Sequence, residues 1–291
     1  MNERIERVDG RVGGPGWCRL DWRSALLFPT DDSAWQAKVG IGGLVLIIPM
    51  IGWVMLLGYR REAIFRLIRG DEPILPEWWG NGARFLVEGL KAVAVINTYY
   101  LPVYLWVGVR LSVSPAAGDI PWVWMLAVSL VAPIFSTLAV PAILAADRFL
   151  ASDPTFTGAE SAGIAAAFGI LTFVIPSGFL NVSRTGRTMS ALDLPRALAR
   201  IIRSPRVYAE AWVGSGLVSL AGHLCGVFAP WGVAWCYLAI VYAFNEVPVA
   251  TGDPDAAYLD RSWFVARRRD RPVAATGPLR PVGNCGASNE T

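Results

Sequence analysis

Long apolar segments dominate the middle of the chain. Six of them lie between residues 39 and 249, and few polar positions interrupt any one of them. A hydrocarbon core about 30 Å thick needs about 20 apolar residues at a rise of about 1.5 Å each. A buried helix of a soluble protein rarely stays apolar on all its faces over such a length. The pattern predicts an all-α, polytopic transmembrane helical bundle with six apolar segments, of which four to six span: 39–59, 86–108, 120–146, 163–182, 207–228 and 233–249.

Polar stretches lie on both sides of this apolar region. Residues 1–38 form a polar N-terminal segment, residues 39–250 the membrane domain, and residues 251–291 a polar tail. No short apolar core follows the basic start, so no cleaved signal peptide is predicted. The tail is rich in proline, glycine and arginine. Such a composition buries too little apolar surface to offset the entropy lost on ordering, so the tail is predicted to be flexible.

Composition and charge agree with a membrane location. Hydrophobic residues make up 54% of the chain and charged residues 17%, which lies outside the usual range of soluble domains. The formal net charge of +3 is too small to indicate a nucleic-acid partner. The four cysteines show neither a C-x-x-C pair nor metal-type spacing, so neither a metal nor a cofactor is predicted.

The membrane domain shows an internal similarity. Residues 42–49 (GGLVLIIP) align with residues 169–176 (GILTFVIP) at an offset of 127, and the same offset carries Arg60 onto Arg187. Repeated halves of this kind occur in many transporter folds. The alignment predicts two similar halves, at about residues 39–146 and 163–250. Each half is expected to contain a bent first segment, a basic helix and two further segments.

Two arginine-rich stretches, residues 60–69 and 195–203, alternate basic and aliphatic positions with a helical period. In the second, Asp193 is a suitable N-cap and Pro195 lies early in the first turn. A helix with arginines on one face and aliphatic residues on the other fits the headgroup plane of a membrane. Packing on the protein's own polar surface is the alternative. The predicted contacts with lipid headgroups are Arg60, Arg61, Arg66, Arg69, Arg196, Arg200 and Arg203.

The distribution of lysine and arginine bears on the topology. If all six segments cross in alternation, the basic loop 60–84 lies outside, against the positive-inside rule. If segments 39–59 and 163–182 instead bend at Pro49 and Pro176 and return, every arginine-rich loop lies in the cytoplasm. Proline-kinked full spans are the alternative. The bent arrangement predicts a multi-pass protein of the inner (cytoplasmic) membrane with both termini in the cytoplasm.

Few polar side chains lie inside the apolar segments. His223 and Asn97 are the intramembrane polar candidates, because such a group in the bilayer indicates either a functional site or a hydrogen bond between helices. For His223, a hydrogen bond to a neighbouring helix is the favoured interpretation. Segment 207–228 also carries a row of small residues, which is typical of a close helix–helix contact within a chain or between chains: Ser215, Ser219, Gly222 and Gly226.

Several short runs in the first half of the chain resemble a known family. These runs are Gly58-Tyr59-Arg60-Arg61, Arg66-x-x-Arg69-Gly70-Asp71-Glu72, Leu75-Pro76-Glu77-Trp78, Gly89-Leu90-Lys91 and Tyr100-Leu101-Pro102. Over about residues 35–249 the chain is similar to the domain of unknown function 4013 family. The resemblance implies a bacterial or archaeal polytopic membrane protein with no assigned activity, and it carries no catalytic residues.

The chain contains no glycine-rich phosphate loop, no G-x-S-x-G and no H-E-x-x-H. The first functional hypothesis is therefore a non-enzymatic scaffold or accessory subunit that contacts anionic lipid and other membrane proteins or itself. The second is a small transporter or channel built from two repeated halves. The third is an intramembrane lipid-modifying enzyme, which would need His223 or the carboxylates of Asp71, Glu72 and Glu77.

Overall fold

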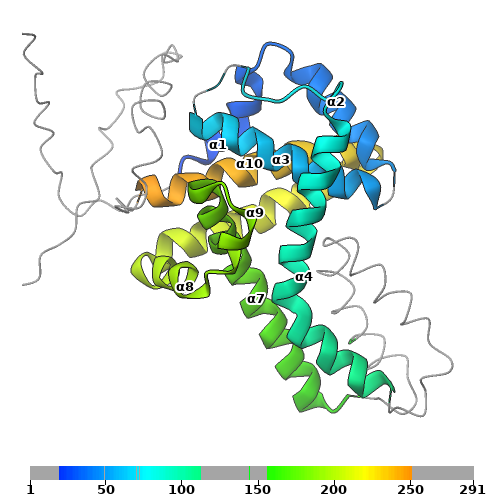
Figure 1. Cartoon of the computed structure of the whole chain (residues 1–291), viewed down its shortest axis with the longest axis vertical. Helices are drawn as coiled ribbons and strands as arrows, with labels where there is room; N and C mark the ends of the chain where they lie inside the picture. Colours follow the sequence, from blue (N-terminus) through cyan, green and yellow to red (C-terminus); the bar gives the residue numbers. More distant parts are fainter. Residues whose placement is uncertain are drawn as a thin grey trace, which may run out of the picture.

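The computed structural model describes residues 20–48, 50–69, 71, 73–112, 144 and 156–250. Within these residues every regular element is a helix, which confirms the all-α class (Figure 1). In chain order the elements are α1 (Trp22–Leu27), η1 (Phe28–Asp31), α2 (Trp35–Leu46), α3 (Ile51–Arg69), α4 (Gly82–Ser112), α7 (Gly158–Thr185), η3 (Thr188–Leu192), α8 (Leu194–Arg203), α9 (Pro205–His223), η4 (Gly226–Phe228) and α10 (Ala229–Ala250).

Among the described residues, three helical stretches are long and apolar enough to cross a membrane: Gly82–Arg110, Gly158–Thr185 and Gly226–Pro248. They indicate a membrane protein, and they coincide with the predicted segments 86–108, 163–182 and 233–249. The predicted segment 120–146 lies outside the described residues except for Leu144, as do residues 1–19 and the predicted tail 251–291. The number of spans therefore stays a prediction.

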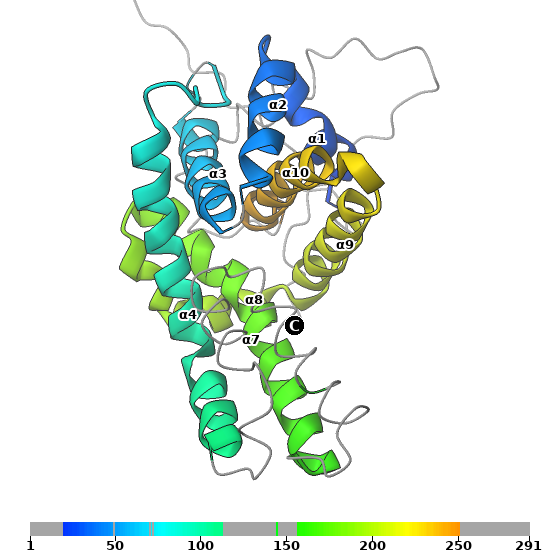
Figure 2. The same cartoon turned by 90° about the vertical axis from the view of Figure 1, so that its right-hand side faces the viewer.

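The first apolar segment is a helical hairpin. α2 ends at Leu46 and α3 begins at Ile51, and between them Met50 has a φ of 62°, in the left-handed region. The two helices lie side by side and run in opposite directions (Figure 2). At the open end of the hairpin, the Lys38 side chain donates a hydrogen bond to the Leu75 carbonyl. The first segment thus reverses direction between α2 and α3, as the bent arrangement predicts.

The fourth apolar segment is not bent in this way. α7 runs unbroken from Gly158 to Thr185 with Pro176 inside it. The prediction that each half begins with a bent segment is therefore wrong for the second half. The aligned stretches also differ in structure, because residues 42–48 include the end of α2 whereas residues 169–176 lie wholly within α7. The two similar halves stay a prediction from the sequence.

The two basic stretches belong to different kinds of element. Residues 60–69 continue α3 without a break and do not form a separate interfacial helix. Residues 195–203 do form a helix of their own, α8, which has Asp193 as its N-cap. The Asp193 carboxylate accepts a hydrogen bond from the Arg196 backbone N–H at 3.3 Å. Pro195 lies in the first turn, where its missing N–H leaves no helical bond unmade.

α10 holds the described helices together, since it contacts α1, α2, α3, α7 and α9 (Figure 2). Beside it, α3 packs along α4. Here Tyr59 stacks on Trp78 with ring centroids 4.3 Å apart, and Phe85 meets both rings edge-on. Further along α4, Tyr100 stacks on Phe168 of α7 with centroids 4.6 Å apart. These aromatic contacts fix the position of α7, whose C-terminal end leads into the candidate site.

Candidate functional site

α7 ends in a tight turn at the point where the candidate span also ends. Gly186 has a φ of 71°, and its N–H donates to the Val182 carbonyl at 2.8 Å, which closes the helix with a left-handed C-cap. Arg61 of α3 donates to the Gly186 carbonyl at 3.3 Å and pairs with Glu88 of α4. The turn after α7 is therefore tied to both α3 and α4.

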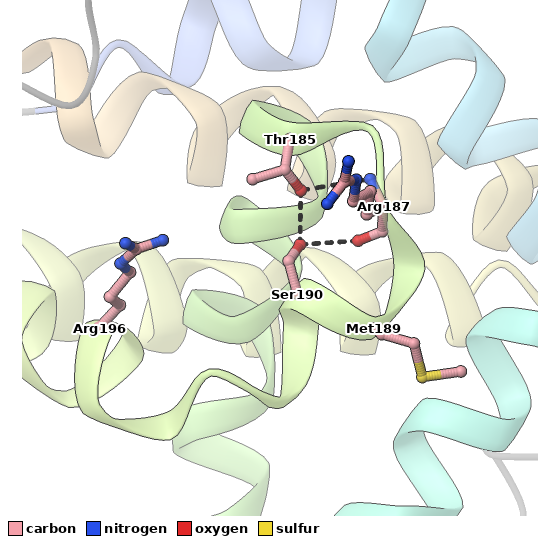
Figure 3. Close-up of a pocket in the computed structure, with 5 residues that line it drawn as sticks. All are labelled: Thr185, Arg187, Met189, Ser190 and Arg196. Atoms are coloured by element: carbon pink, nitrogen blue, oxygen red, sulfur yellow. Dashed lines mark hydrogen bonds between the residues drawn. The ribbon is translucent and has the colours of Figure 1, made fainter.

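Two hydroxyl groups hold this turn in shape. Thr185 Oγ1 and Ser190 Oγ lie 2.7 Å apart, and Ser190 Oγ donates to the Arg187 carbonyl at 2.7 Å (Figure 3). Thr185 Oγ1 accepts from the Arg187 N–H at 3.2 Å and lies 2.9 Å from the Asn181 carbonyl. Each hydroxyl carries one proton, and both protons are used within the turn. Thr185 and Ser190 therefore stiffen the turn.

A pocket of about 530 Å³ opens beside the turn. The guanidinium groups of Arg187 and Arg196 lie on either side of its two hydroxyl residues (Figure 3). Arg196 is paired with Asp193 at 3.3 Å and remains exposed. The exposed Arg187 side chain makes no hydrogen bond or ion pair within the described part of the chain. The pocket is lined by Thr185, Arg187, Met189, Ser190 and Arg196.

The outer surface of α8 carries apolar and basic side chains together. Leu194, Leu198 and Ile202 are four residues apart, so they form one row along the helix, and they are 44%, 44% and 75% exposed. Arg196 and Arg203 are also exposed, on another face of the helix. A helix that presents an aliphatic row and arginines together suits the boundary between headgroups and acyl chains.

Arg200 points the other way, into the protein. Its side chain is only 6% exposed and donates to the Ser177 carbonyl at 2.8 Å and to Asn181 Oδ1 at 3.0 Å, both on α7. Ser177 Oγ in turn donates to the Ala197 carbonyl at 2.9 Å. The small Ala197 lets α8 approach α7 closely, and Arg200 shares its face of the helix. Arg200 therefore fastens α8 to α7, contrary to the prediction that it contacts lipid headgroups.

A proline inside α7 leaves a backbone carbonyl free to bond a side chain of α9. Pro176 has no N–H, so the carbonyl of Thr172, four residues earlier, loses its helical donor. Trp212 of α9 donates its indole N–H to that carbonyl at 3.4 Å. A side chain of another helix thus satisfies the group that the proline frees, and α7 continues through Pro176 without a break.

The Tyr208 hydroxyl of α9 bridges the next backbone donor and acceptor of α7, the Ser177 N–H and the Phe173 carbonyl. The Tyr208 hydroxyl accepts from the Ser177 N–H at 3.0 Å and donates to the Phe173 carbonyl at 2.7 Å. Tyr208 and Trp212 are four residues apart on α9, and together they repair the gap in α7.

Replacing Tyr208 by phenylalanine is expected to lower the free energy of unfolding by about 1–3 kcal/mol, because the Ser177 N–H and the Phe173 carbonyl stay buried without this partner. Thermal unfolding in a mild detergent measures the change. The control is the same substitution in a Pro176→Ala background: without the proline ring α7 can tighten, so that the Ser177 N–H bonds the Phe173 carbonyl directly and the loss should shrink. An equal loss in both backgrounds would contradict the bridging role.

Most of the other predicted headgroup arginines have contacts within the chain. Arg60 lies over the Tyr237 ring, 5.6 Å from its centroid. Arg66 donates to the Pro73 carbonyl at 3.1 Å, and Arg69 pairs with Asp71 at 3.2 Å. With Arg61 bound to Glu88 and Gly186, the basic end of α3 mainly stabilises the helix and its loop. Arg203, like Arg196, lies exposed on α8.

The row of small residues on α9 faces the interior of the chain. Ser215 and Gly222 are buried, while Ser219 is partly exposed. A Cβ on Gly222 would lie 2.9 Å from Cys236 Sγ and 3.0 Å from the backbone of Gly232, so α9 and α10 meet closely there. Gly226 is exposed, has a φ of 60° and lies beyond the end of α9. It therefore takes no part in this helix–helix contact, contrary to the prediction.

The two intramembrane polar candidates lie apart from the pocket. His223 is the last residue of α9, and its Nδ1 lies 2.7 Å from the Ser219 carbonyl of the same helix. This contact differs from the predicted bond to a neighbouring helix. Asn97 is partly buried on α4. Within the described residues, no group of three or more His, Cys, Asp and Glu side chains is placed to hold a metal ion.

A buried lysine lies at the open end of the α2–α3 hairpin. Lys38 is 3% exposed, and its Nζ lies 3.0 Å from Asp32 Oδ2 and 2.9 Å from Glu77 Oε1. The same ammonium donates to the Leu75 carbonyl at 2.7 Å, which uses its third proton. The Lys38 carbonyl accepts from the Trp78 indole N–H at 2.8 Å. Lys38 thus closes the hairpin by joining α2 to the loop after α3.

Some of the residues that carry the family resemblance lie around Lys38. Leu75, Glu77 and Trp78 contact it, and Tyr59 stacks on Trp78. The family described as "Protein of unknown function (DUF4013)" matches residues 41–231. The chain belongs to the DUF4013 family. In this DUF4013 protein the matched region runs from α2 into α10 and includes the pocket beside α8. No curated protein and no solved structure matches the chain.

Three residues of the pocket and the hairpin of this DUF4013 protein were not among the predicted site residues: Arg187, Lys38 and Asp32. Arg187 directly follows Gly186, and a glycine followed by a basic residue at the end of an apolar helix is a recognisable C-cap signal. That signal could have placed Arg187 at the headgroup level. Lys38 and Asp32 are six residues apart, which matches no helical period, so their pairing had no local signal.

Proposed function

We propose that this DUF4013 protein is a non-enzymatic membrane scaffold or accessory subunit, which holds other membrane proteins and attaches to anionic lipid. The observation that carries the proposal is the use of buried charge. The buried Lys38 and Arg200 and the half-buried Arg61 each bind groups from other elements of the same chain. Buried polar networks of this kind make a fold rigid. A rigid helical frame supports binding surfaces for partners.

The surface of α9 is where we place the partner. Val213, Leu217, Leu220 and Leu224 follow one another at spacings of four, three and four, and each is more than half exposed. The opposite side of α9 packs on α10. α9 is not one of the three candidate spans among the described residues. The spacing of the row is that with which two helices interlock their side chains. The occupant is therefore an apolar helix of another membrane protein.

Replacing Leu217 and Leu220 by alanine is expected to release the partner while leaving the protein folded, because both side chains lie on the surface. Co-purification in a mild detergent, quantified by native mass spectrometry, measures the bound fraction. The matched control is Leu105→Ala with Val109→Ala on the candidate span α4, whose side chains are 60% and 62% exposed against 63% and 56% for Leu217 and Leu220. Equal retention in both double variants would exclude the α9 surface.

Native mass spectrometry of the tagged protein, extracted gently from its own membrane, tests the function as a whole. A scaffold or accessory subunit is expected to appear with a partner protein in a fixed ratio. A lone chain or a homodimer that retains a specific small molecule would overturn the proposal. That outcome fits the second candidate, a small transporter, which the α2–α3 hairpin favours because transporters use helices interrupted inside apolar segments.

A further inference from the structure

We propose that the pocket beside η3 and α8 binds the phosphate headgroup of a single anionic phospholipid. This assignment rests on the lipid-binding part of the proposed function and names its site. It is independent of partner binding at α9.

The position of the pocket at the end of a candidate span supports the binding of a lipid headgroup. The candidate span Gly158–Thr185 ends at Thr185, which is itself a lining residue. The residues that follow the end of a span lie at the level of the headgroups, where basic side chains meet anionic lipid. The pocket thus begins where the apolar part of α7 stops.

The charge of the pocket supports an anion. Arg187 is exposed and makes no hydrogen bond or ion pair within the described residues, whereas Arg66, Arg69 and Arg84 each pair with a carboxylate of the chain. Arg196 pairs with the partly exposed Asp193. A guanidinium offers five donors, so Arg196 keeps donors for a ligand while it pairs with Asp193. Two arginines that line one pocket suit a phosphate.

The edge of the pocket supports a lipid rather than a free anion. Met189 lines the pocket and is 69% exposed. A free phosphate has no use for an exposed apolar side chain, whereas the glycerol and upper acyl carbons of a phospholipid would cover it.

The pocket is also rigid before anything binds. Gly186 closes α7, and the hydroxyls of Thr185 and Ser190 bind the backbone and each other across the turn. Arg61 holds the same turn from α3. A site that is already ordered loses less conformational entropy when it binds its ligand.

The experiment is a lipid titration of the full chain in a neutral detergent, followed by native mass spectrometry. The probes are phosphatidylglycerol and phosphatidylcholine, which share the phosphate but differ in net charge. One phosphatidylglycerol molecule is expected to bind, in preference to phosphatidylcholine. Arg187→Gln with Arg196→Gln should weaken it about fivefold for each charge removed. The control is Arg23→Gln, another exposed arginine without a contact in the described residues, which should change nothing.

Two further arms separate a lipid from free phosphate. An excess of inorganic phosphate should leave phosphatidylglycerol bound, and Met189→Ser should weaken the lipid. Displacement by phosphate, together with no effect of Met189→Ser, would overturn the lipid assignment. Equal binding of both lipids, or equal effects of the Arg23 variant and the pocket variant, would overturn the site. Thermal unfolding confirms that each variant is folded.

Discussion

Replacing Lys38 by methionine is expected to lower the free energy of unfolding by about 3–5 kcal/mol. Methionine keeps the length and most of the volume of the side chain, so packing changes little. The charge is lost, however, and Asp32, whose side chain is fully buried, then lacks the ammonium that neutralises it. The Leu75 carbonyl and the Glu77 carboxylate lose the same partner. Thermal or denaturant unfolding in a mild detergent measures the loss.

An exposed ion pair provides the matched control for Lys38. Lys91 lies 2.7 Å from Glu88 on the surface of α4 and is 49% exposed. Lys91→Met should cost at most about 1 kcal/mol, because water screens the pair and Glu88 keeps Arg61. The double variant Lys38→Met with Asp32→Asn should recover much of the loss, since no buried charge is then left unpaired and the exposed Glu77 carboxylate is solvated. If Lys38→Met and Lys91→Met cost the same, Lys38 does not close the hairpin.

The long apolar helices could be predicted from the sequence because their signal is local. Each of the segments 86–108, 163–182 and 233–249 is apolar along its whole length, and each lies within one helix of the structure. Hydropathy depends only on the residues of the segment itself. The prediction of α8 with its Asp193 cap succeeded for the same reason, since cap, proline and helical period all lie within about ten residues.

The shape of the first and fourth segments could not be predicted in the same way. Their sequences align, yet one is a hairpin and the other is continuous through Pro176. What keeps α7 continuous is supplied by Tyr208 and Trp212, more than thirty residues further along the chain. A local pattern shows that a proline removes a donor. It does not show which distant side chain satisfies the carbonyl that is freed.

The arginines of α8 show the same limit at the level of the site. Arg196, Arg200 and Arg203 recur with a helical period and were predicted to act together. In the structure Arg196 and Arg203 are exposed, whereas Arg200 is buried against α7. Arg196 and Arg200 are thus one helical turn apart, yet one faces solvent and the other binds α7. The deciding factor is which face meets α7, and that depends on Ala197 and on the groups that α7 presents there.

The crossing of α3 and α4 leads to a second prediction of a large loss in the free energy of unfolding. Gly58 of α3 and Gly89 of α4 belong to the runs that resemble the family, and each lies directly against the backbone of the other helix. A Cβ on Gly58 would fall well inside van der Waals contact with the Phe85 carbonyl oxygen, and one on Gly89 would meet the Val54 carbonyl oxygen in the same way. Backbone cannot rotate aside as a side chain can. Gly58→Ala and Gly89→Ala are each expected to cost about 1–3 kcal/mol or more.

Gly108 of α4 is the matched control, because a Cβ there would meet nothing within 4 Å. Gly108→Ala should be neutral or stabilising by up to about 1 kcal/mol, since alanine loses less backbone entropy in a helix. Unfolding in a mild detergent compares the three variants. The double variant of Gly58 and Gly89 should cost less than the sum of the single ones, because either alanine already moves the helices apart. Strictly additive losses would show that the two glycines act at separate contacts.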